Sequence, residues 1–283
     1  MVDPILSVII ATRHRAEPLA RCLASLAGQT HPRDRWEVIV VHDGEEKPAD
    51  DRATCFAIKR LQQAHAGCGI ARNTGAAEAH GQYLIFTDDD CLFPPDWLSR
   101  FEAGFLANPG CMIAGIAQNW LSTNAYSQAT QAMTEALLEY SNREPAGAQV
   151  ALGNNLGVPA RDFHKLGGFS PRYFRNAAED RDFSARWLRE GRRIVSDPGI
   201  VVFHAHELNL RSFLEQHYNY GRGSYVYHRA QAERHQRRWQ PLGFYISMMS
   251  RAPSMRVRML LVLSQLAHTM GFARSFMPSS VQK

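Results

Sequence analysis

The chain has 283 residues, of which 45% are hydrophobic and 21% are charged, a composition typical of a globular enzyme with a substantial core. This length suits one large domain, or one domain with an appendage. No stretch reaches the roughly 18 to 20 apolar residues of a membrane-spanning helix. The apolar segment 5–11 follows Asp3 and no basic residue, so we do not expect a secretory signal.

The net charge of +5 conceals an asymmetry between two parts of the chain. Residues 1–205 carry 21 Lys and Arg against 24 Asp and Glu, a net charge of −3, whereas residues 206–283 carry 11 against 3, a net charge of +8. The basic surplus suggests an anionic partner for the tail. Because no nucleic-acid-binding motif accompanies it, we expect no nucleic acid partner.

The first ninety residues alternate between apolar strands and helical patterns. The predicted strands are 5–10, 36–41 and 83–86, and the predicted helical segments are 17–28, 53–64 and 71–79. This alternation predicts a parallel sheet with right-handed crossovers. Farther along the chain we expect helices in 94–98 and onward, 125–142, 175–191 and 255–276, and strands at 111–120, 194–195 and 200–203.

Three adjacent carboxylates follow directly after one of the predicted strands. Asp88, Asp89 and Asp90 cannot be buried without a cation or solvent. In extended geometry Asp88 and Asp90 would point the same way, and two oxygen ligands on one side suit a hard divalent ion. Asp43 ends another strand, and neighbouring strand ends meet in one crevice. The alternative is a solvated acidic turn, with Asp43 serving only as a turn residue before Gly44.

Several different short motifs follow one another between about Leu6 and about His206. They are Thr12-Arg13-His14-Arg15, Val40-Val41-His42-Asp43-Gly44, Ala71-Arg72-Asn73-Thr74-Gly75, Phe86-Thr87-Asp88-Asp89-Asp90, Gly153-Asn154-Asn155, Gly167-Gly168-Phe169, Glu179-Asp180 with Arg186, and His204. In this order and spacing, the chain resembles the family-2 glycosyltransferases of the GT-A fold. The resemblance implies an α/β fold with a Rossmann-like, mostly parallel sheet flanked by helices.

The resemblance also implies the residues of a nucleotide-sugar site. Asp43 would bind a uracil-like base, and Asp88 would bind the ribose or the metal. Asp90 and His204 would be ligands, with Asp88, of a Mn²⁺ or Mg²⁺ cofactor. The other residues implied in donor binding are Thr12, Arg15, Arg72 and Asp89.

On the acceptor side, the resemblance implies that Asp180 is the catalytic base and that Glu179 lies beside it near the acceptor. Asn155 would lie under the sugar and the acceptor. The chain departs from the family pattern at Ala11, Arg13, His14, His42 and Glu45. These positions surround the expected nucleotide base, so the identity of the donor nucleotide is the least secure part of the resemblance.

We therefore expect an inverting, metal-dependent transfer of a sugar, carried by a nucleotide diphosphate such as UDP, to an acceptor hydroxyl in cell-surface glycan or glycolipid synthesis. The acceptor would be a glycan, a lipid-linked sugar or a small molecule. The rival hypothesis is a non-catalytic nucleotide-sugar-binding scaffold in glycan assembly. A sugar nucleotidyltransferase is disfavoured, because no Gly-rich phosphate loop with a lysine lies near the amino end.

The expected organisation is a glycosyltransferase domain over 1–205, with a nucleotide-sugar half (1–110) and an acceptor half (111–205), followed by a basic helical extension (206–283). We expect a cytoplasmic protein. The helical pattern at 255–276 predicts either a packing helix or peripheral contact with an anionic membrane. His235-Gln236-Arg237-Arg238-Trp239 is similar to a signature of processive polysaccharide synthases, but its spacing is one residue short, so we interpret it as part of the basic tail.

Overall fold

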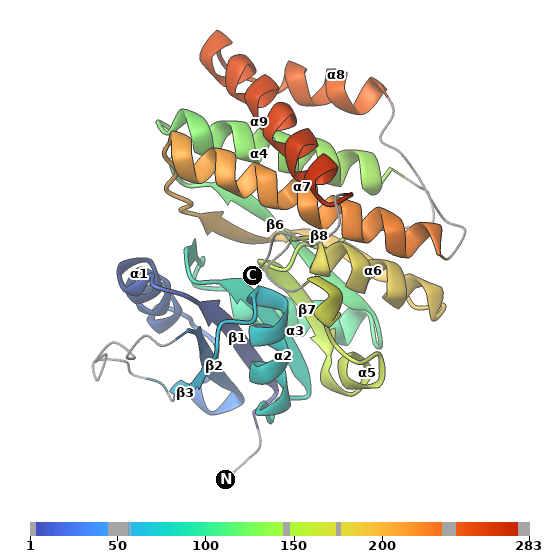
Figure 1. The fold of residues 1–283 in the computed structure, drawn as a ribbon. Helices are drawn as coiled ribbons and strands as arrows, with labels where there is room; N and C mark the ends of the chain where they lie inside the picture. The colour runs from blue at the N-terminus through green and yellow to red at the C-terminus, as the bar shows by residue number, and fades with distance from the viewer. Residues whose placement is uncertain are drawn as a thin grey trace.

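The computed structural model describes residues 4–44, 56, 58–143, 148–173, 177–233 and 242–276. An eight-stranded sheet with the order β3-β2-β1-β4-β7-β6-β8-β5 forms the centre of this part of the chain. Helices flank the sheet, and a further layer of helices lies beyond it (Figure 1). The predicted α/β fold class is thus confirmed, with a sheet flanked by helices and further helices at the carboxyl end of the chain.

The strands at the amino end form the parallel part of the sheet. β1 pairs in parallel with β2 and β4, and β2 pairs in parallel with β3. The second part is mixed, because β7 runs antiparallel to both β4 and β6 whereas β8 runs parallel to β6. The strands are β1 (Leu6–Thr12), β2 (Trp36–Asp43), β3 (Ile58–Gln63), β4 (Tyr83–Asp88), β5 (Cys91–Leu92), β6 (Met112–Asn119), β7 (Asn155–Pro159) and β8 (Ile194–His204).

Apolar side chains on both faces of the sheet hold the flanking helices. Along β1, Val8 and Ile10 pack with α1 (Ala16–Ala27) and α3 (Trp97–Ala107), whereas Ile9 packs on the opposite face. Burial on both faces explains why this strand is continuously apolar in sequence. The opposite face is covered by α2 (Cys68–Ala77), α5 (Ala160–Lys165) and α6 (Glu179–Arg189). Two short 3₁₀ helices complete this part, η1 (Arg33–Arg35) and η2 (Pro171–Tyr173).

Two sequence predictions of local structure were wrong, and one strand was not predicted. Residues 58–63, predicted as part of a helix, form the strand β3, because pairing with β2 outweighs the helical pattern of that segment. β7 was not predicted; it occupies the position between β4 and β6, where tertiary pairing and not local composition sets the conformation. The two short strands expected around Pro198 are one strand, β8, whose pairing with β6 is irregular between Ala114 and Ile116.

The layer beyond the sheet, which we call the helical layer, consists of four helices. They are α4 (Ala125–Ser141), α7 (Leu210–Ala232), α8 (Leu242–Ser250) and α9 (Met255–Arg274). Their buried residues form one apolar cluster that draws on all four helices. Since α4 belongs to the segment predicted as the acceptor half, this cluster crosses the predicted boundary at residue 205. The division of the chain there stays a prediction.

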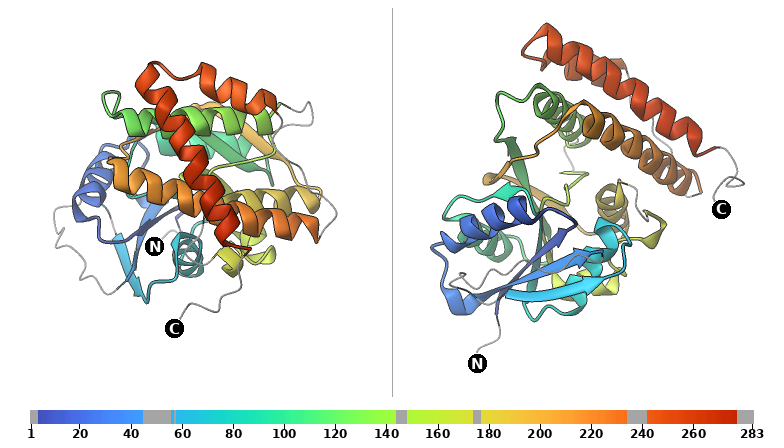
Figure 2. Two further views of the ribbon diagram at one scale, coloured as in Figure 1. Left: turned by 45° about the horizontal axis from the view of Figure 1, so that its top comes forward. Right: turned by 60° about the vertical axis from the view of Figure 1, so that its left-hand side comes forward.

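Helices α7 and α9 touch closely, and glycine permits this approach. A Cβ added to Gly271 would lie 1.9 Å from the backbone oxygen of Tyr218, and one added to Gly221 would lie 1.9 Å from that of His268. Figure 2 shows α9 on the outer side of α7, away from the sheet. Among the helices of the described part of the chain, none is long and apolar enough to cross a membrane.

Candidate active site

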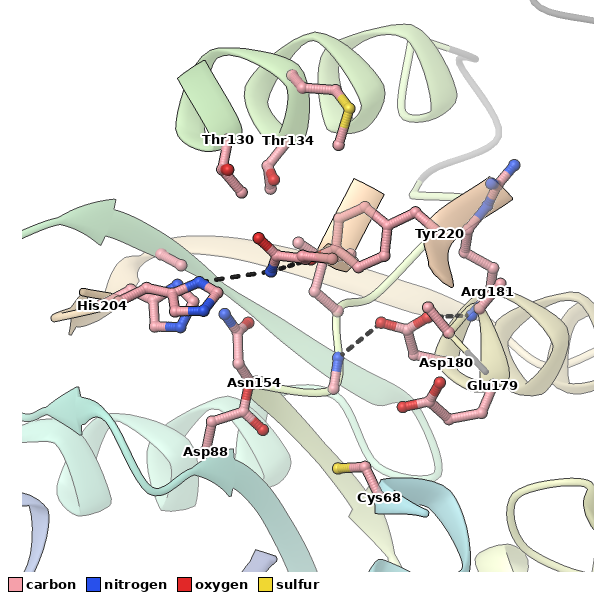
Figure 3. Close-up of a pocket in the computed structure, with 18 of the residues that line it drawn as sticks. Cys68, Asp88, Thr130, Thr134, Asn154, Glu179, Asp180, Arg181, His204 and Tyr220 are labelled. Carbon is pink, nitrogen blue, oxygen red and sulfur yellow. Dashed lines mark hydrogen bonds between the residues drawn. The ribbon is translucent and has the colours of Figure 1, made fainter. Parts of the chain in front are cut away.

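A cavity of about 620 Å³ lies between the strand ends of the sheet and the helical layer. On the sheet side it is lined by the acidic turn after β4, the start of α6 and the end of β8. On the helical side it is lined by residues of α4, α7, α8 and α9. Residues separated by more than 150 positions in the sequence therefore line one space (Figure 3).

The acidic turn is held by its own cationic and hydroxyl partners. Arg15 Nη1 lies 2.8 Å from Asp89 Oδ1, and Arg15 Nη2 lies 2.6 Å from Asp90 Oδ2. Thr12 donates a hydrogen bond of 2.6 Å to the other oxygen of Asp89. Burial nevertheless raises the pKa of Asp89 to about 7. Thr12, Arg15 and Asp89 all line the cavity, as does Asp88.

Extended geometry predicted that Asp88 and Asp90 point the same way, and the structure contradicts this prediction. β4 ends at Asp88, and the chain turns at residues 89–90. Asp88 Oδ1 lies 2.6 Å from Arg72 Nη2, while Asp90 faces Arg15 and His204. The period-two rule holds only within a strand, so it does not extend across this turn.

Arg72 joins the acidic turn to the start of α6. It is buried, and its second nitrogen, Nη1, lies 2.9 Å from Glu179 Oε1. Its guanidinium carbon also lies 5.7 Å from the ring centroid of Phe169. A Cβ at Gly153 would lie 2.4 Å from Arg72 Nη1, so a larger residue there would displace the guanidinium group. Burial and the nearby Asp180 raise the pKa of Glu179, although Arg72 opposes this shift.

Asp90, His204 and His206 bring three candidate ligand atoms within 4.8 Å of one another. Asp90 Oδ1 is buried and lacks a hydrogen bond from the described residues, although His204 Nε2 lies 3.0 Å away. Burial alone would lower the pKa of His204, but the Asp90 carboxylate more than offsets it and the pKa is raised. A carboxylate with two imidazoles fits a first-row divalent ion, because the carboxylate suits Mn²⁺ and the imidazoles suit ions such as Fe²⁺ or Zn²⁺. Asp88 is not in this group.

Asp180 lies on the opposite side of the cavity, at the first turn of α6. Its Oδ2 accepts a hydrogen bond of 3.1 Å from the Gly153 backbone N–H, and its Oδ1 accepts one of 2.7 Å from that of Arg181. Figure 3 shows Asp180 and Glu179 facing the cavity beneath Tyr220 of α7. The two backbone donors fix the carboxylate while leaving lone pairs free to accept a proton.

Asp43 lies at the end of β2 and borders the cavity, as the sequence placed it. Its two oxygens accept hydrogen bonds from the side chains of Gln63 and His65 and from the backbone N–H groups of Ala66 and Gly67. Burial opposes ionisation, but these donors lower the pKa of Asp43 overall. Four bonds occupy the four lone-pair positions of a carboxylate, so Asp43 holds the turn before α2.

Asn155 does not reach the cavity, contrary to prediction. It is 1% exposed, and its Oδ1 accepts a hydrogen bond of 3.1 Å from Trp97 Nε1. Its Nδ2 donates to the carbonyl groups of Ile116 and Ile200, each at 2.9 Å. Asn155 therefore ties β7 to β6, β8 and α3, and the neighbouring Asn154 lines the cavity instead.

The sequence reasoning missed several residues of the site. His206 is a candidate ligand that was not singled out from the sequence, although it follows His204 by only two residues. The helical side had no comparable signal; its polar residues include Thr130, Thr134, Gln216, Tyr220, Gln265 and His268. Cys68 is exposed and lines the cavity, while Cys22, Cys91 and Cys111 are buried. Cys55, Glu45 and the segment 235–239 lie outside the described residues.

Curated proteins similar in sequence are named as glycosyltransferases. Glycosyltransferase AglE of Haloferax volcanii is 33% identical over 34% of this chain and 34% of its own length. The validoxylamine A glucosyltransferase of Streptomyces hygroscopicus is 26% identical over 75% of this chain and 59% of its own. The pre-mycofactocin glycosyltransferase of Mycobacterium tuberculosis is 28% identical over 76% of this chain and 46% of its own length. The chain thus matches only part of each relative, about a third of AglE.

Two solved structures share the fold over nearly the whole chain. A mannosyltransferase from Pyrobaculum calidifontis, in complex with GDP-Man and Mn²⁺, has a TM-score of 0.60 at 20% identity and covers 94% of this chain and 74% of its own. TarS of S. aureus has a TM-score of 0.58 at 15% identity, and the match covers 97% of this chain and 93% of the TarS chain. The model of the family "Glycosyl transferase family 2" matches residues 7–167. With this match over more than half of its length, the chain belongs to glycosyl transferase family 2.

Proposed function

We propose that the protein is an inverting glycosyltransferase that moves a sugar from a nucleotide-diphosphate donor to an acceptor hydroxyl. The observation that carries the proposal is the single cavity that has the acidic turn at one side and Asp180 at the other. A displacement at carbon needs a stabilised leaving group on one face of the sugar and a proton acceptor on the other. The arrangement of the cavity supplies candidates for both.

We assign the metal site to Asp90, His204 and His206, with Asp88 at its edge. When bound, a divalent ion would supply the positive charge that stabilises a departing diphosphate. Arg15 keeps the Asp90 carboxylate in place through its 2.6 Å ion pair, and Arg72 does the same for Asp88. Partial burial of these ion pairs strengthens their electrostatic effect.

The base of the donor would lie near Asp43, whose contribution is to hold the turn 63–67. Its carboxylate is saturated by four hydrogen bonds, so direct recognition of the base would fall to other groups bordering the cavity, such as Ala11 and Arg13. These are two of the positions at which the sequence departs from the family pattern. We therefore propose UDP as the first nucleotide to test, with GDP as the alternative.

Asp180 is our proposed general base, and Glu179 our proposed neighbour of the acceptor. Glu179 is already paired with Arg72, whereas Asp180 accepts two backbone hydrogen bonds from the part of the chain that the structure describes. Asp180 therefore has the free capacity that proton transfer requires. Since both residues begin α6, their backbone is fixed relative to the sheet.

The rival function, a scaffold that binds a nucleotide sugar without turnover, uses the same donor site. The placement of a fixed carboxylate across the cavity favours catalysis over the scaffold. The compartment we propose is the cytoplasm, where the free cysteines of the described chain would stay reduced. Synthesis of a cell-surface glycan or glycolipid is the corresponding proposal for its role.

Calorimetry of UDP and GDP binding with and without Mn²⁺ tests the donor site. We expect the Asp90→Asn variant to weaken nucleotide binding in Mn²⁺ by about tenfold or more, because it removes a ligand charge. The matched control is Asp96→Asn, which removes an exposed carboxylate that is paired with Arg100 on the surface. Equal affinity of Asp90→Asn and wild type in saturating Mn²⁺ would exclude Asp90 as a ligand.

A further inference from the structure

The outer face of α8 and α9 carries an unusual concentration of exposed apolar side chains. Within the described residues, ten of the thirteen exposed large apolar side chains lie in the segment 242–276. On α9 they are Met255, Met259, Val262, Leu263, Leu266 and Met270, with exposed fractions of 39% to 67%. A patch of this kind on a protein surface marks a contact with another apolar surface.

Helix α9 is apolar on both of its sides. Its inner side, including Val257, Leu260 and Leu261, is buried in the cluster shared with α4, α7 and α8. At about 100° per residue, the six exposed residues of its outer side fall within a stripe roughly 100° wide. An ordinary surface helix has polar residues on the side away from the core, so the packing of α9 on the protein does not account for its outer side.

The charges around this stripe are all positive. On the helix, Arg256 and Arg274 lie beyond one edge of the stripe and Arg258 beyond the other, and all three residues are exposed. The segment 242–276 contains no Asp or Glu. Arg251, in the same segment, differs from these three arginines because its charge is paired with Glu135 and Glu139 of α4. The complementary surface is therefore apolar with anionic groups at its boundary.

Two partners could cover this stripe, a second copy of the chain or a lipid surface, and the positive charges around it distinguish them. A second copy bound through a twofold axis would place the arginines of one stripe near those of the other, with no carboxylate of 242–276 between them. An anionic phospholipid surface instead offers phosphate at the depth of the arginines and acyl chains beneath. We propose that the outer face of α8 and α9 docks the protein on an anionic lipid bilayer.

Docking in this orientation would place one edge of the catalytic cavity at the lipid surface. Tyr245 of α8 lines the cavity and also lines a shallow outer groove with Ile246, Met249 and Arg258. Figure 2 shows α8 and α9 at the periphery of the molecule, far from the amino terminus. An acceptor with a lipid chain could therefore reach the cavity past Tyr245. This last step rests on the proposed function, whereas docking itself does not.

Co-sedimentation of the full chain with vesicles tests the docking. The vesicles are an equimolar mixture of phosphatidylglycerol and phosphatidylcholine, compared with phosphatidylcholine alone, at low and high salt. We expect binding to the anionic vesicles at low salt and a marked loss at high salt. The Leu266→Glu variant should partition about tenfold or more weakly, because it removes an apolar side chain and adds a negative charge.

The matched control is Leu106→Glu, which makes the same change at an exposed position of α3 on the far part of the molecule. It should bind like wild type, and thermal unfolding should show that both variants remain folded. Wild type left in the supernatant at low salt, or equal binding by the two variants, would overturn the proposal. The proposal would also be overturned if the wild-type protein were a dimer without lipid and the Leu266→Glu variant were a monomer. Hydrolysis of a UDP-sugar, measured in parallel, separates failure of docking from failure of the proposed function.

Discussion

The two sides of the cavity are built in different ways. On the sheet side, the charged side chains are tied to one another, with Arg15 and Arg72 each holding two carboxylates. On the helical side, the lining is uncharged and mixed, with hydroxyl, amide and aromatic groups such as Thr134, Gln265 and Phe244. A fixed set of charges suits the unvarying chemistry of a diphosphate, whereas a neutral lining defines the shape available to an acceptor.

The pKa values of the histidines depend on whether the Asp90 carboxylate or burial has the larger effect. Asp90 raises the pKa of His204 on the sheet side despite burial. On the helical side, burial lowers the pKa of His217 to about 3 and that of His268 to about 4. Asp90 thus favours the charged form of His204, whereas burial favours the neutral form of the helical-side histidines and also of His206, whose pKa is lowered to about 4. Changes on the sheet side should affect catalysis and the donor first, and changes on the helical side should affect packing and the acceptor.

The largest effect should come from Asp180→Asn on the sheet side. The amide cannot accept the proton of the attacking hydroxyl, so we expect turnover to fall by about 10²–10⁴-fold with nearly unchanged donor affinity. Calorimetry and steady-state kinetics separate the two quantities. Turnover close to that of wild type would remove Asp180 from the role of base. A product that retains the donor's anomeric configuration, detected by NMR, would contradict the single displacement.

Next in size is the effect of Arg72→Met on stability. The substitution leaves the buried Glu179 carboxylate without its cation, and breaking such a buried pair costs about 3–5 kcal/mol of the free energy of unfolding. Denaturant unfolding measures this change. The control is Arg100→Met, which breaks an exposed ion pair with Asp96 and should cost less than about 1 kcal/mol. Equal losses for the two variants would show that Arg72 does not join the two parts of the site.

A smaller effect is expected where the helical layer is assembled. Gly271→Ala would place a Cβ 1.9 Å from the Tyr218 backbone oxygen, so α7 and α9 must separate at a cost of about 1–3 kcal/mol. The control is Gly243→Ala on α8, where a Cβ would meet nothing within 4 Å. Urea unfolding compares the two variants. A stable Gly271→Ala variant would mean that the helical layer moves more freely than the sheet side.

The smallest expected effect is the loss of folding stability at acidic pH that is due to His268. His268 is neutral in the fold, with a pKa lowered to about 4 by burial and by Arg181, whereas its unfolded pKa is about 6.5. Between these values the unfolded chain binds more protons, so stability falls as the pH falls through this window. From pH 7 to pH 5 we expect wild type to lose roughly 1–2 kcal/mol more than His268→Gln. Urea unfolding at both pH values measures the difference; parallel losses would show that His268 is not buried as described.

Local pattern was enough to predict the sheet side of the site. Continuous apolar runs predicted β1, β2 and β4, and carboxylates placed after such runs had to lie at strand ends. The start of α6 at Glu179 was likewise visible from its acidic first turn. These features depend on residues close together in the chain, and short-range physics decides them.

Other features depended on contacts between distant segments. Residues 58–63 form a strand only because β2 offers an edge. Asn155 is buried because β7 lies between β6 and β4, and Asn154 lines the cavity instead. The full donor set of the candidate metal site likewise required the turn after β4 to meet the end of β8.

The sequence by itself determined the α/β class, the family resemblance, the acidic turn and the basic, apolar tail. The tertiary structure alone decided that the tail covers the cavity and that α9 leaves an apolar stripe exposed. Helical spacing shows which residues of a helix share a side, but not which side packs inward when both are apolar. That choice follows from the close contact at Gly221 and Gly271, which brings α9 onto α7 and turns its other side to solvent.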